Sequence, residues 1–366
     1  MFETLSQYGL SDIHLLCDDA CGLQAIIAIH DTSLGPAIGG CRYLFYPSDL
    51  AAIEDAARLA QGMSYKAALA GLPFGGGKAV IIKPETEIDR ELLFTKMGDF
   101  IASLQGRYIT ALDSGSTLSD MDIMATRSTY VSSSSKIGDC SLYTAEGIYS
   151  GIKEAFQVRF ASDSLKQARI AIQGLGHVGM ALAQRLYRAG ATLIVSDLDP
   201  RKTQYAQQHF KAKVVIGEEI YQQSCDVFAP CGLGGIINAG SIPRLRCAII
   251  AGAANNQLAK NSDEQLLRDR GILYVPDFAI NAGGLIYASM RYAGEQQAAI
   301  DEKLRGIAVT IRQLLADSTG QPEPTQSPLQ AALLLAKQRI AGGQNTTANP
   351  MPISSSRHKP QITVTG

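Results

Sequence analysis

The run at positions 174–179, with the sequence GLGHVG, constrains the fold most, because its spacing is GxGxxG. It follows an apolar stretch over 169–173 that is typical of a strand, and it leads into a helical pattern over 178–189. In that context the first glycine makes a tight turn, the second lets a pyrophosphate approach the backbone, and the third lets the helix pack on the strand. The helix N-terminus then offers free N–H groups to the phosphates. The run predicts a dinucleotide site, and the alternative is a glycine-rich turn without a ligand.

Short apolar strands and helices continue to alternate after this run. The expected strands cover 191–196, 226–229, 247–251 and 272–275, and an expected helix covers 200–210. Such alternation predicts a parallel, doubly wound sheet. Asp197 ends the strand that follows the run, where a carboxylate accepts hydrogen bonds from a ribose and repels a 2′-phosphate. It therefore favours NAD over NADP, although Arg201 nearby weakens that preference.

The N-terminal third mixes helices and strands less regularly. The patterns predict strands at 24–30, 79–82 and 108–111, a glycine-dense turn at 35–40, and helices from Ser48 or Asp49 to about Lys66 and over 89–104. We expect an α/β chain with an N-terminal mixed α/β domain plus a Rossmann-type doubly wound NAD-binding domain. The family resemblance given below implies that the first is the substrate and assembly domain. The expected bounds are 1–138 for the first domain, 139–320 for the second, 321–341 for a C-terminal helix that packs back on the first, and 342–366 for a disordered tail.

Composition excludes several classes of protein. The net charge of −1 gives no global basic surface for nucleic acid or acidic lipid. Seven scattered cysteines without a CxxC pair, and five histidines far apart, argue against a disulfide framework and against a metal site. No apolar segment reaches membrane-spanning length, and the N-terminus lacks the pattern of a signal peptide. We therefore expect a cytoplasmic protein without a membrane, nucleic-acid or metal partner.

Two lysines next to glycines are the candidate reactive groups. Lys78 follows three glycines at 75–77 and begins a buried strand, where desolvation lowers the pKa of an ammonium. Lys66, at the end of the preceding helix, supplies a second positive charge, and Asp113 ends another strand and can shuttle protons. A glycine-rich hairpin with two surface lysines remains an alternative. A phosphate-binding P-loop is excluded because Ala79 follows Lys78.

Several segments together resemble the glutamate/leucine/phenylalanine/valine dehydrogenase family, and within it most resemble the leucine-type members. They follow the family's order from about residue 20 to residue 290. The matching segments are Gly35-Pro36-Ala37-Ile38-Gly39-Gly40, Gly62-Met63-Ser64-Tyr65-Lys66, Gly75-Gly76-Gly77-Lys78, Tyr108-Ile109-Thr110-Ala111-Leu112-Asp113, 174–179, Ala229-Pro230-Cys231, Ala251-Gly252-Ala253-Ala254-Asn255-Asn256 and Asn281-Ala282-Gly283-Gly284.

The resemblance implies the reaction and the role of each residue. The reaction is the NAD-dependent oxidative deamination of an L-amino acid to a 2-oxo acid and ammonia, and its reverse. Lys78 would be catalytic, Asp113 its acid/base partner, and Lys66 the ligand of the substrate carboxylate. The implied substrate-binding residues are Lys66, Gly39, Gly40, Ile38, Asn255, Asn256 and Ala288. The implied cofactor-binding residues are Gly174, Leu175, Gly176, His177, Val178, Gly179, Met180, Asp197, Thr144, Ala229, Cys231 and Asn255. We expect His177 to be a surface or packing residue without a catalytic role.

Two positions bear on the substrate. In glutamate-specific members a lysine matches Ile38 and a serine matches Ala288, and both bind the side-chain carboxylate. An apolar pocket is therefore expected, with leucine or another branched-chain amino acid favoured. A phenylalanine or valine dehydrogenase is the alternative, and a non-catalytic dinucleotide-binding regulator is a more remote one. The resemblance also implies a homo-oligomer. Departures from the family pattern are Leu112 before the aspartate, a short loop at 132–140, and the absence of an acidic pair in 285–291.

Overall fold

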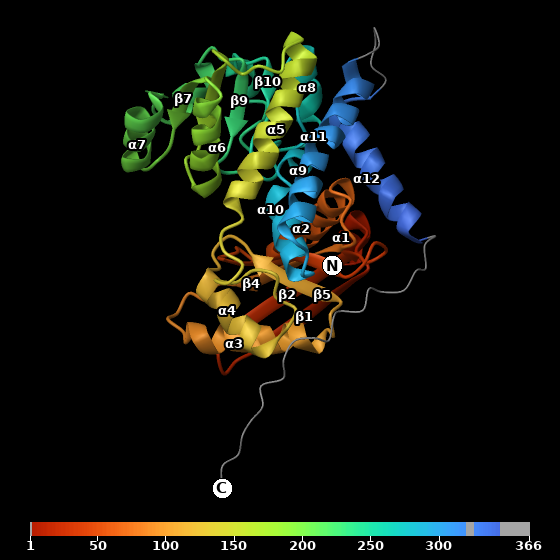
Figure 1. The fold of residues 1–366 in the computed structure, drawn as a ribbon. Coiled ribbons are helices and arrows are strands. Elements are labelled where there is room, and N and C mark those ends of the chain that lie inside the picture. The colour runs from red at the N-terminus through yellow and green to blue at the C-terminus, as the bar shows by residue number, and fades with distance from the viewer. Residues whose placement is uncertain (1, 320–325, 345–366) are drawn as a thin grey trace.

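The computed structural model describes residues 2–319 and 326–344, and the N-terminal part is built on a five-stranded mixed sheet (Figure 1). The strand order is β1-β2-β4-β3-β5. Strand β2 is antiparallel to both β1 and β4, and β3 is parallel to both β4 and β5. The strands are β1 (Asp12–Asp18), β2 (Leu23–Asp31), β3 (Ala37–Leu44), β4 (Gly75–Ile82) and β5 (Tyr108–Leu112).

Helices cover both faces of this sheet. They are α1 (Phe2–Tyr8), α2 (Asp49–Leu69), α3 (Arg90–Ser103) and α4 (Leu118–Arg127). Side chains alternate along a strand, so that Ile26 of β2 joins the core under α2 while Ile27 joins the core under α3 and α4. Ser48 caps α2, as predicted, by accepting a hydrogen bond from the Ala51 N–H at 3.2 Å. This arrangement fixes the position of α2 across the sheet.

Most of the two glycine runs lies inside strands. The turn predicted at 35–40 ends at residue 36, where β3 follows, and the strand predicted to begin at Ala79 begins at Gly75. Gly39 of β3 pairs with Thr110 of β5, and Gly77 of β4 pairs with Ile29 of β2. A Cβ on Gly39 would lie 1.7 Å from the Gly77 carbonyl oxygen, and a Cβ on Gly77 would lie 2.8 Å from the Tyr108 ring. These glycines therefore allow close packing in the sheet, where the sequence pattern indicated a chain reversal.

The second part is a six-stranded parallel sheet in the order β11-β10-β9-β6-β7-β8, which confirms the doubly wound prediction. Its strands are β6 (Arg169–Gln173), β7 (Thr192–Ser196), β8 (Lys213–Val214), β9 (Val227–Pro230), β10 (Ile249–Ile250) and β11 (Leu273–Tyr274). Its helices are α5 (Ser141–Phe160), α6 (His177–Arg188), α7 (Pro200–Phe210), α8 (Asp263–Asp269), α9 (Asp277–Ile280) and α10 (Gly283–Tyr292), with short 3₁₀ helices at Gly217–Gln222 and Ile242–Arg244.

Of the last two helices, α11 (Gln297–Thr319) leads away from the first part and α12 (Pro328–Gln344) returns toward it (Figure 1). Helix α11 packs along α5, and α12 packs against both α11 and α2. The predicted C-terminal helix at 321–341 thus begins at Pro328 and continues through three residues that were assigned to the tail. Residues 320–325 and 345–366, the remainder of the predicted tail, lie outside the described residues.

One apolar core joins the two parts. It contains Ile38, Tyr65 and Leu69 of the first part together with Ile170 and Ile280 of the second. Within residues 2–319 and 326–344, none of the helices has both the length and the apolar character that a bilayer-crossing segment needs. The shared core places the end of α2 against the second part.

Candidate active site

Lys78 and Asp113 meet over the parallel strands of the first sheet. Lys78 lies within β4 and is only 5% exposed, and its ammonium donates a hydrogen bond to the carboxylate of Asp113, which follows β5. Strand β3 runs between these two strands. Gly40 of β3 makes the contact possible, because a Cβ there would lie 2.7 Å from the Asp113 Cβ and 2.8 Å from its Oδ2. The structure thus brings together three of the residues singled out in the sequence.

The surroundings of Lys78 favour its neutral form. Burial, the largest effect, lowers the pKa of Lys78 to about 7, and the positive charges of Arg42 and Lys66 act in the same direction. Asp55 and Cys41 act in the opposite direction. An amine with this pKa can accept a proton near neutral pH, which an ordinary lysine does poorly.

Lys66 lies in the last turn of α2, half-buried, at the junction of the two parts. Its Nζ donates to Oδ1 of Asn255 at 3.2 Å, and Asn281 Nδ2 donates to the same oxygen at 2.9 Å. Burial lowers the pKa of Lys66 to about 8, while Asp277 and Cys140 act in the opposite direction. Lys66 and Asn255, both singled out in the sequence, therefore face each other across the junction.

The GxGxxG loop has the geometry that its spacing predicts. Gly174 has a φ of 94°, and a Cβ there would lie 2.7 Å from the Gly232 N–H nitrogen. A Cβ on Gly179 would lie 2.0 Å from the Gly174 carbonyl oxygen, so that only glycine lets α6 approach the loop. Gly176 is the N-cap of α6, makes no side-chain cap and faces open space. The first N–H groups of α6 are therefore accessible to a pyrophosphate, and the loop fits a dinucleotide.

Asp197 lies at the end of β7 beside this loop. Its Oδ2 accepts a hydrogen bond from the Leu175 N–H at 2.5 Å, and its Oδ1 accepts one from the Asp199 N–H at 2.8 Å. Arg201 is paired with Asp199 rather than with Asp197. Leu198 and Ile216, which follow adjacent strands, are 97% and 80% exposed. Sequence reasoning missed these two apolar side chains, because a single apolar residue in a loop carries no pattern.

The other residues singled out in the sequence lie around the ends of the second sheet. Val178 and Met180 belong to α6, and Ala229 and Cys231 stand at the end of β9, where the Cys231 N–H donates to the Gln173 carbonyl at 2.7 Å. The His177 side chain is exposed, the first of its two expected placements, and its Nδ1 lies 3.3 Å from the Asp139 carboxylate.

Three more of these residues belong to the second part. Thr144 is in the first turn of α5, and a Cβ on Gly284 would lie 2.6 Å from its Oγ1. Asn256 has a φ of 51°, in the left-handed region. Ala288 is nearly buried on α10. Ile38, by contrast, is fully buried in the shared core, where it packs with Tyr65.

Arg42, Asp55 and Asp277 are charged residues near the lysines that sequence reasoning missed. Asp277, at the start of α9, is buried and accepts a hydrogen bond from the Gln257 N–H at 2.8 Å. Burial raises the pKa of Asp277, and Lys66 is one of the groups that oppose this rise. Among the described residues, no cluster of three or more histidine, cysteine, aspartate or glutamate side chains is placed to hold a metal ion.

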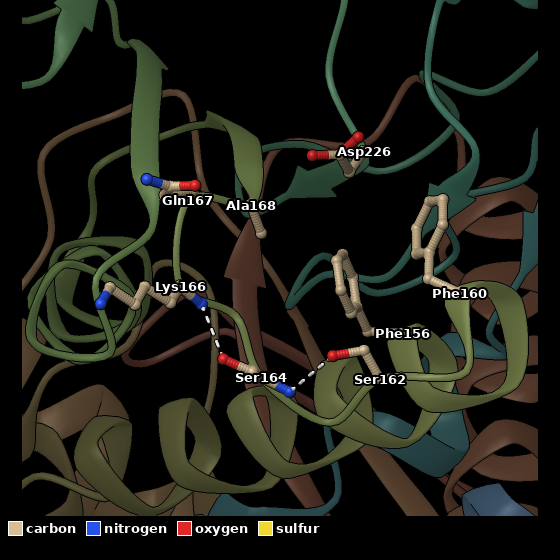
Figure 2. Close-up of a pocket in the computed structure, with 8 residues that line it drawn as sticks. All are labelled: Phe156, Phe160, Ser162, Ser164, Lys166, Gln167, Ala168 and Asp226. Carbon is tan, nitrogen blue, oxygen red and sulfur yellow. Dashed lines mark hydrogen bonds between the residues drawn. The ribbon is translucent and has the colours of Figure 1, made fainter.

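A surface cavity of about 560 Å³ lies away from these residues (Figure 2). Phe156 and Phe160 line it from the end of α5, while Lys166 and Ala168 precede β6 and Asp226 precedes β9. It therefore opens at the amino ends of the strands. Ligands of doubly wound sheets bind at the carboxyl ends, where the GxGxxG loop and Asp197 lie. This cavity does not belong to the candidate site.

Comparison with known proteins decides the family. Residues 12–130 match the model of the Glu/Leu/Phe/Val dehydrogenase dimerisation domain, and residues 199–347 match that of the Glutamate/Leucine/Phenylalanine/Valine dehydrogenase domain. The chain is 42% identical over 344 residues to the leucine dehydrogenase of Bacillus subtilis (strain 168), which covers 93% of this chain and 94% of the relative. The chain belongs to the Glu/Leu/Phe/Val dehydrogenase family.

Other members of the family show similar agreement. The valine dehydrogenase of Streptomyces coelicolor is 39% identical over 342 residues, which cover 92% of this chain and 93% of the relative. The crystal structure of L-tryptophan dehydrogenase from Nostoc punctiforme superposes with a TM-score of 0.81 at 39% identity and covers 94% of this chain and 100% of that one. As a member of this family the chain is an amino-acid dehydrogenase, an oxidoreductase that uses a nicotinamide dinucleotide.

Proposed function

We propose that this chain catalyses the NAD-dependent oxidative deamination of an apolar L-amino acid, with leucine or another branched-chain amino acid preferred, and the reverse reductive amination. The observation that carries this proposal is the buried Lys78–Asp113 pair, together with Lys66, which contacts Asn255 and is near enough for its charge to lower the pKa of Lys78. The similarity to leucine dehydrogenases at 42% identity supports leucine as the substrate.

The proposed mechanism divides the work between the two lysines. Lys66 pairs with the substrate α-carboxylate and orients Cα toward the second part. The nicotinamide ring, when bound, accepts the hydride that leaves Cα. Neutral Lys78 takes a proton from the water molecule that adds to the imino carbon of the substrate, and Asp113 relays protons to and from the lysine. Lys78 then returns its proton to the carbinolamine nitrogen, the hydroxyl gives its proton to the Lys78–Asp113 pair, and the C–N bond breaks to release ammonia and the 2-oxo acid.

We propose NAD as the preferred dinucleotide because of Asp197. Its carboxylate lies where a ribose hydroxyl is expected, and a 2′-phosphate there would meet a negative charge. The exposed Leu198 and Ile216 offer an apolar clamp for the adenine. Losing the hydrogen bonds to the ribose and gaining repulsion should cost NADP about 2–4 kcal/mol of binding free energy.

We propose an apolar substrate pocket with Ile38 and Ala288 in its wall. Neither side chain can pair with a γ-carboxylate, and burying an unpaired carboxylate costs several kcal/mol. Ala288 is small, and the similarity to a tryptophan dehydrogenase supports the alternative that a larger substrate, such as phenylalanine, is accepted. Valine is the other alternative, since one methylene changes the free energy by only about 1–3 kcal/mol.

We further propose a homo-oligomer in the cytoplasm. The match of residues 12–130 to a dimerisation domain supports the assembly. None of the seven cysteines is in a disulfide, which supports a reducing compartment.

A substrate panel tests the proposed activity. Initial rates of nicotinamide reduction at alkaline pH are measured with L-leucine, valine, phenylalanine, tryptophan and glutamate, each with NAD and with NADP. We expect leucine with NAD to be best, and glutamate to be lower in kcat/KM by roughly three decades or more. Turnover of glutamate within tenfold of the best apolar substrate, or equal kcat/KM for the two dinucleotides, would contradict the proposal.

The same assay tests Lys78. We expect Lys78→Ala to abolish turnover and to leave NADH binding, measured by fluorescence titration, nearly unchanged, since Lys78 lies outside the dinucleotide loop. If the variant kept a tenth of the wild-type kcat, the role proposed for Lys78 would be wrong.

A further inference from the structure

Arg42 lies between two carboxylates directly behind the reactive pair. It belongs to β3, two residues after Gly40. Its NH1 donates to Asp55 Oδ2 at 2.8 Å, and its NH2 lies 3.7 Å from Asp113 Oδ1. The side chains of all three residues are at most 16% exposed. A charged chain thus runs from Asp55 through Arg42 and Asp113 to Lys78.

Asp55 anchors this chain on α2, the helix that also carries Lys66. Besides Arg42, its carboxylate accepts hydrogen bonds from the Tyr46 hydroxyl at 2.7 Å and from Arg58 NH2 at 2.8 Å. Although burial opposes ionisation, these partners hold the pKa of Asp55 below its ordinary value. Asp55 is therefore a fixed negative charge, and Arg42 is attached to the helix through it.

The contacts of Arg42 leave one of its donors without a partner. Its Nε is buried and makes no hydrogen bond to the described residues. Burying a guanidinium with a donor unpaired is costly, and a second positive charge beside Lys78 adds repulsion. An apolar side chain in the same strand would avoid both penalties. The placement therefore points to a role in the site rather than in the stability of the fold.

The two oxygens of Asp113 face different partners. Oδ2 accepts from Lys78, whereas Oδ1 accepts from the Ser114 N–H at 2.6 Å and faces Arg42. We propose that Arg42, anchored by Asp55, is a positioning residue that aims the Asp113 carboxylate at Lys78 and biases this pair toward its proton-accepting state. This inference rests on the proposed roles of Lys78 and Asp113.

The charged and titratable groups around Lys78 show why Arg42 matters with substrate bound. They are Arg42 and Cys41 from β3, Asp55 and Lys66 from α2, and Asp113 after β5. Of these groups, Arg42 and Lys66 repel the protonated lysine. In the proposed complex the substrate carboxylate neutralises Lys66, so that Arg42, which is itself paired with Asp55, is the positive neighbour that still favours the neutral amine.

The pH dependence of kcat/KM with L-leucine tests this inference. The acid limb of the wild type should lie near the Lys78 pKa of about 7. Arg42→Met should move this limb to higher pH by about one to two units, since a repelling charge is lost, and should lower kcat at least tenfold. Asp55→Asn should move it to lower pH, since a charge that attracts the proton is lost. Arg42→Lys keeps the positive charge but loses the guanidinium geometry that contacts two carboxylates. Its acid limb should stay at the wild-type pH, and its kcat should still fall.

Arg58→Met is the matched control. It removes a half-exposed arginine from the outer oxygen of the same Asp55 carboxylate, and the acid limb should stay in place. If Arg42→Met and Asp55→Asn keep the wild-type limb while Lys78→Ala is inactive, the inference is wrong and the proposed function stands. If Arg42→Met does not fold, as judged by circular dichroism, Arg42→Lys decides, and wild-type kcat in that variant overturns the inference. Substantial activity in Lys78→Ala would instead contradict the proposed function itself.

Discussion

Gly40 does not have a positive φ, so its backbone conformation does not require glycine. Its lack of a side chain leaves room for the Asp113 carboxylate. The chain at this point is a regular strand, so that any residue could adopt its backbone conformation. The space above it is filled by the Asp113 carboxylate, which needs that position to reach Lys78. Glycine is therefore required at position 40 because the Asp113 side chain packs directly against it.

Gly40→Ala tests this requirement. The new Cβ should displace Asp113 by about an ångström and lower kcat by roughly two orders of magnitude, because small misplacements of reactive groups are costly. NADH binding should be unchanged. Gly306→Ala is the control: it lies within α11, where a Cβ meets open space, and it should raise the free energy of unfolding by about 0.5–1 kcal/mol. Wild-type kcat in Gly40→Ala would show that Asp113 can still reach Lys78 with a Cβ at position 40, and would contradict this requirement.

Helix α12 connects the two parts of the molecule through polar contacts near each end. Near its start, the Leu329 N–H donates to Glu264 of α8 at 3.0 Å, and the Ser327 hydroxyl donates to the same carboxylate. Near its end, Arg339 NH1 donates to the carbonyls of Ala68 at 3.0 Å and Leu69 at 2.7 Å, which terminate α2. The helix thus fastens the turn that carries Lys66 to the second part.

Arg339→Met should loosen this turn. Leaving two helix-end carbonyls without their charged donor should lower the free energy of unfolding by about 1–3 kcal/mol. The KM for L-leucine should rise several-fold through Lys66, with the dissociation constant of NADH unchanged. Arg305→Met, on the exposed side of α11, is the comparison. The expectation fails if the two variants have the same thermal midpoint and the same KM.

The elements that sequence predicted well have a clear period and a clear boundary. The strand at 169–173 and the helix at 200–210 were placed to the residue, since an apolar run and a proline at the first turn mark them. Strand β3 was missed because its glycines imitate a turn. Lys66 and Asn255 are 189 positions apart, and only the resemblance to a family brought them into one site. Arg42 carried no signal, since one arginine in a strand usually points to solvent.

At the scale of the whole molecule, the N-terminal sheet ends in strand β1, which pairs with β2 alone among the described strands. Leu15 in the middle of this strand is half-exposed. An open edge with an apolar side chain favours association, which agrees with the match to a dimerisation domain. The molecule thus has a surface suited to a second copy.

Light scattering of the purified protein tests the assembly. We expect a native mass that is a whole multiple, two or more, of the 39.0 kDa chain. The mass should be the same at low and at high salt, because burial of apolar surface is not screened. A mass of one chain at micromolar concentration would contradict the proposed homo-oligomer.

The return of α12 to α2 also determines when the protein can finish folding on the ribosome. Arg339 and Ala68 are 271 positions apart, so the hydrogen bonds from Arg339 to the end of α2 can form only after nearly the whole chain has been synthesised. At about 5–20 residues per second this delay is on the order of tens of seconds. During that time the side of α2 against which α12 later packs is open to chaperones. Nascent chains stalled before residue 328 should therefore remain bound to such factors, and completed chains should be released.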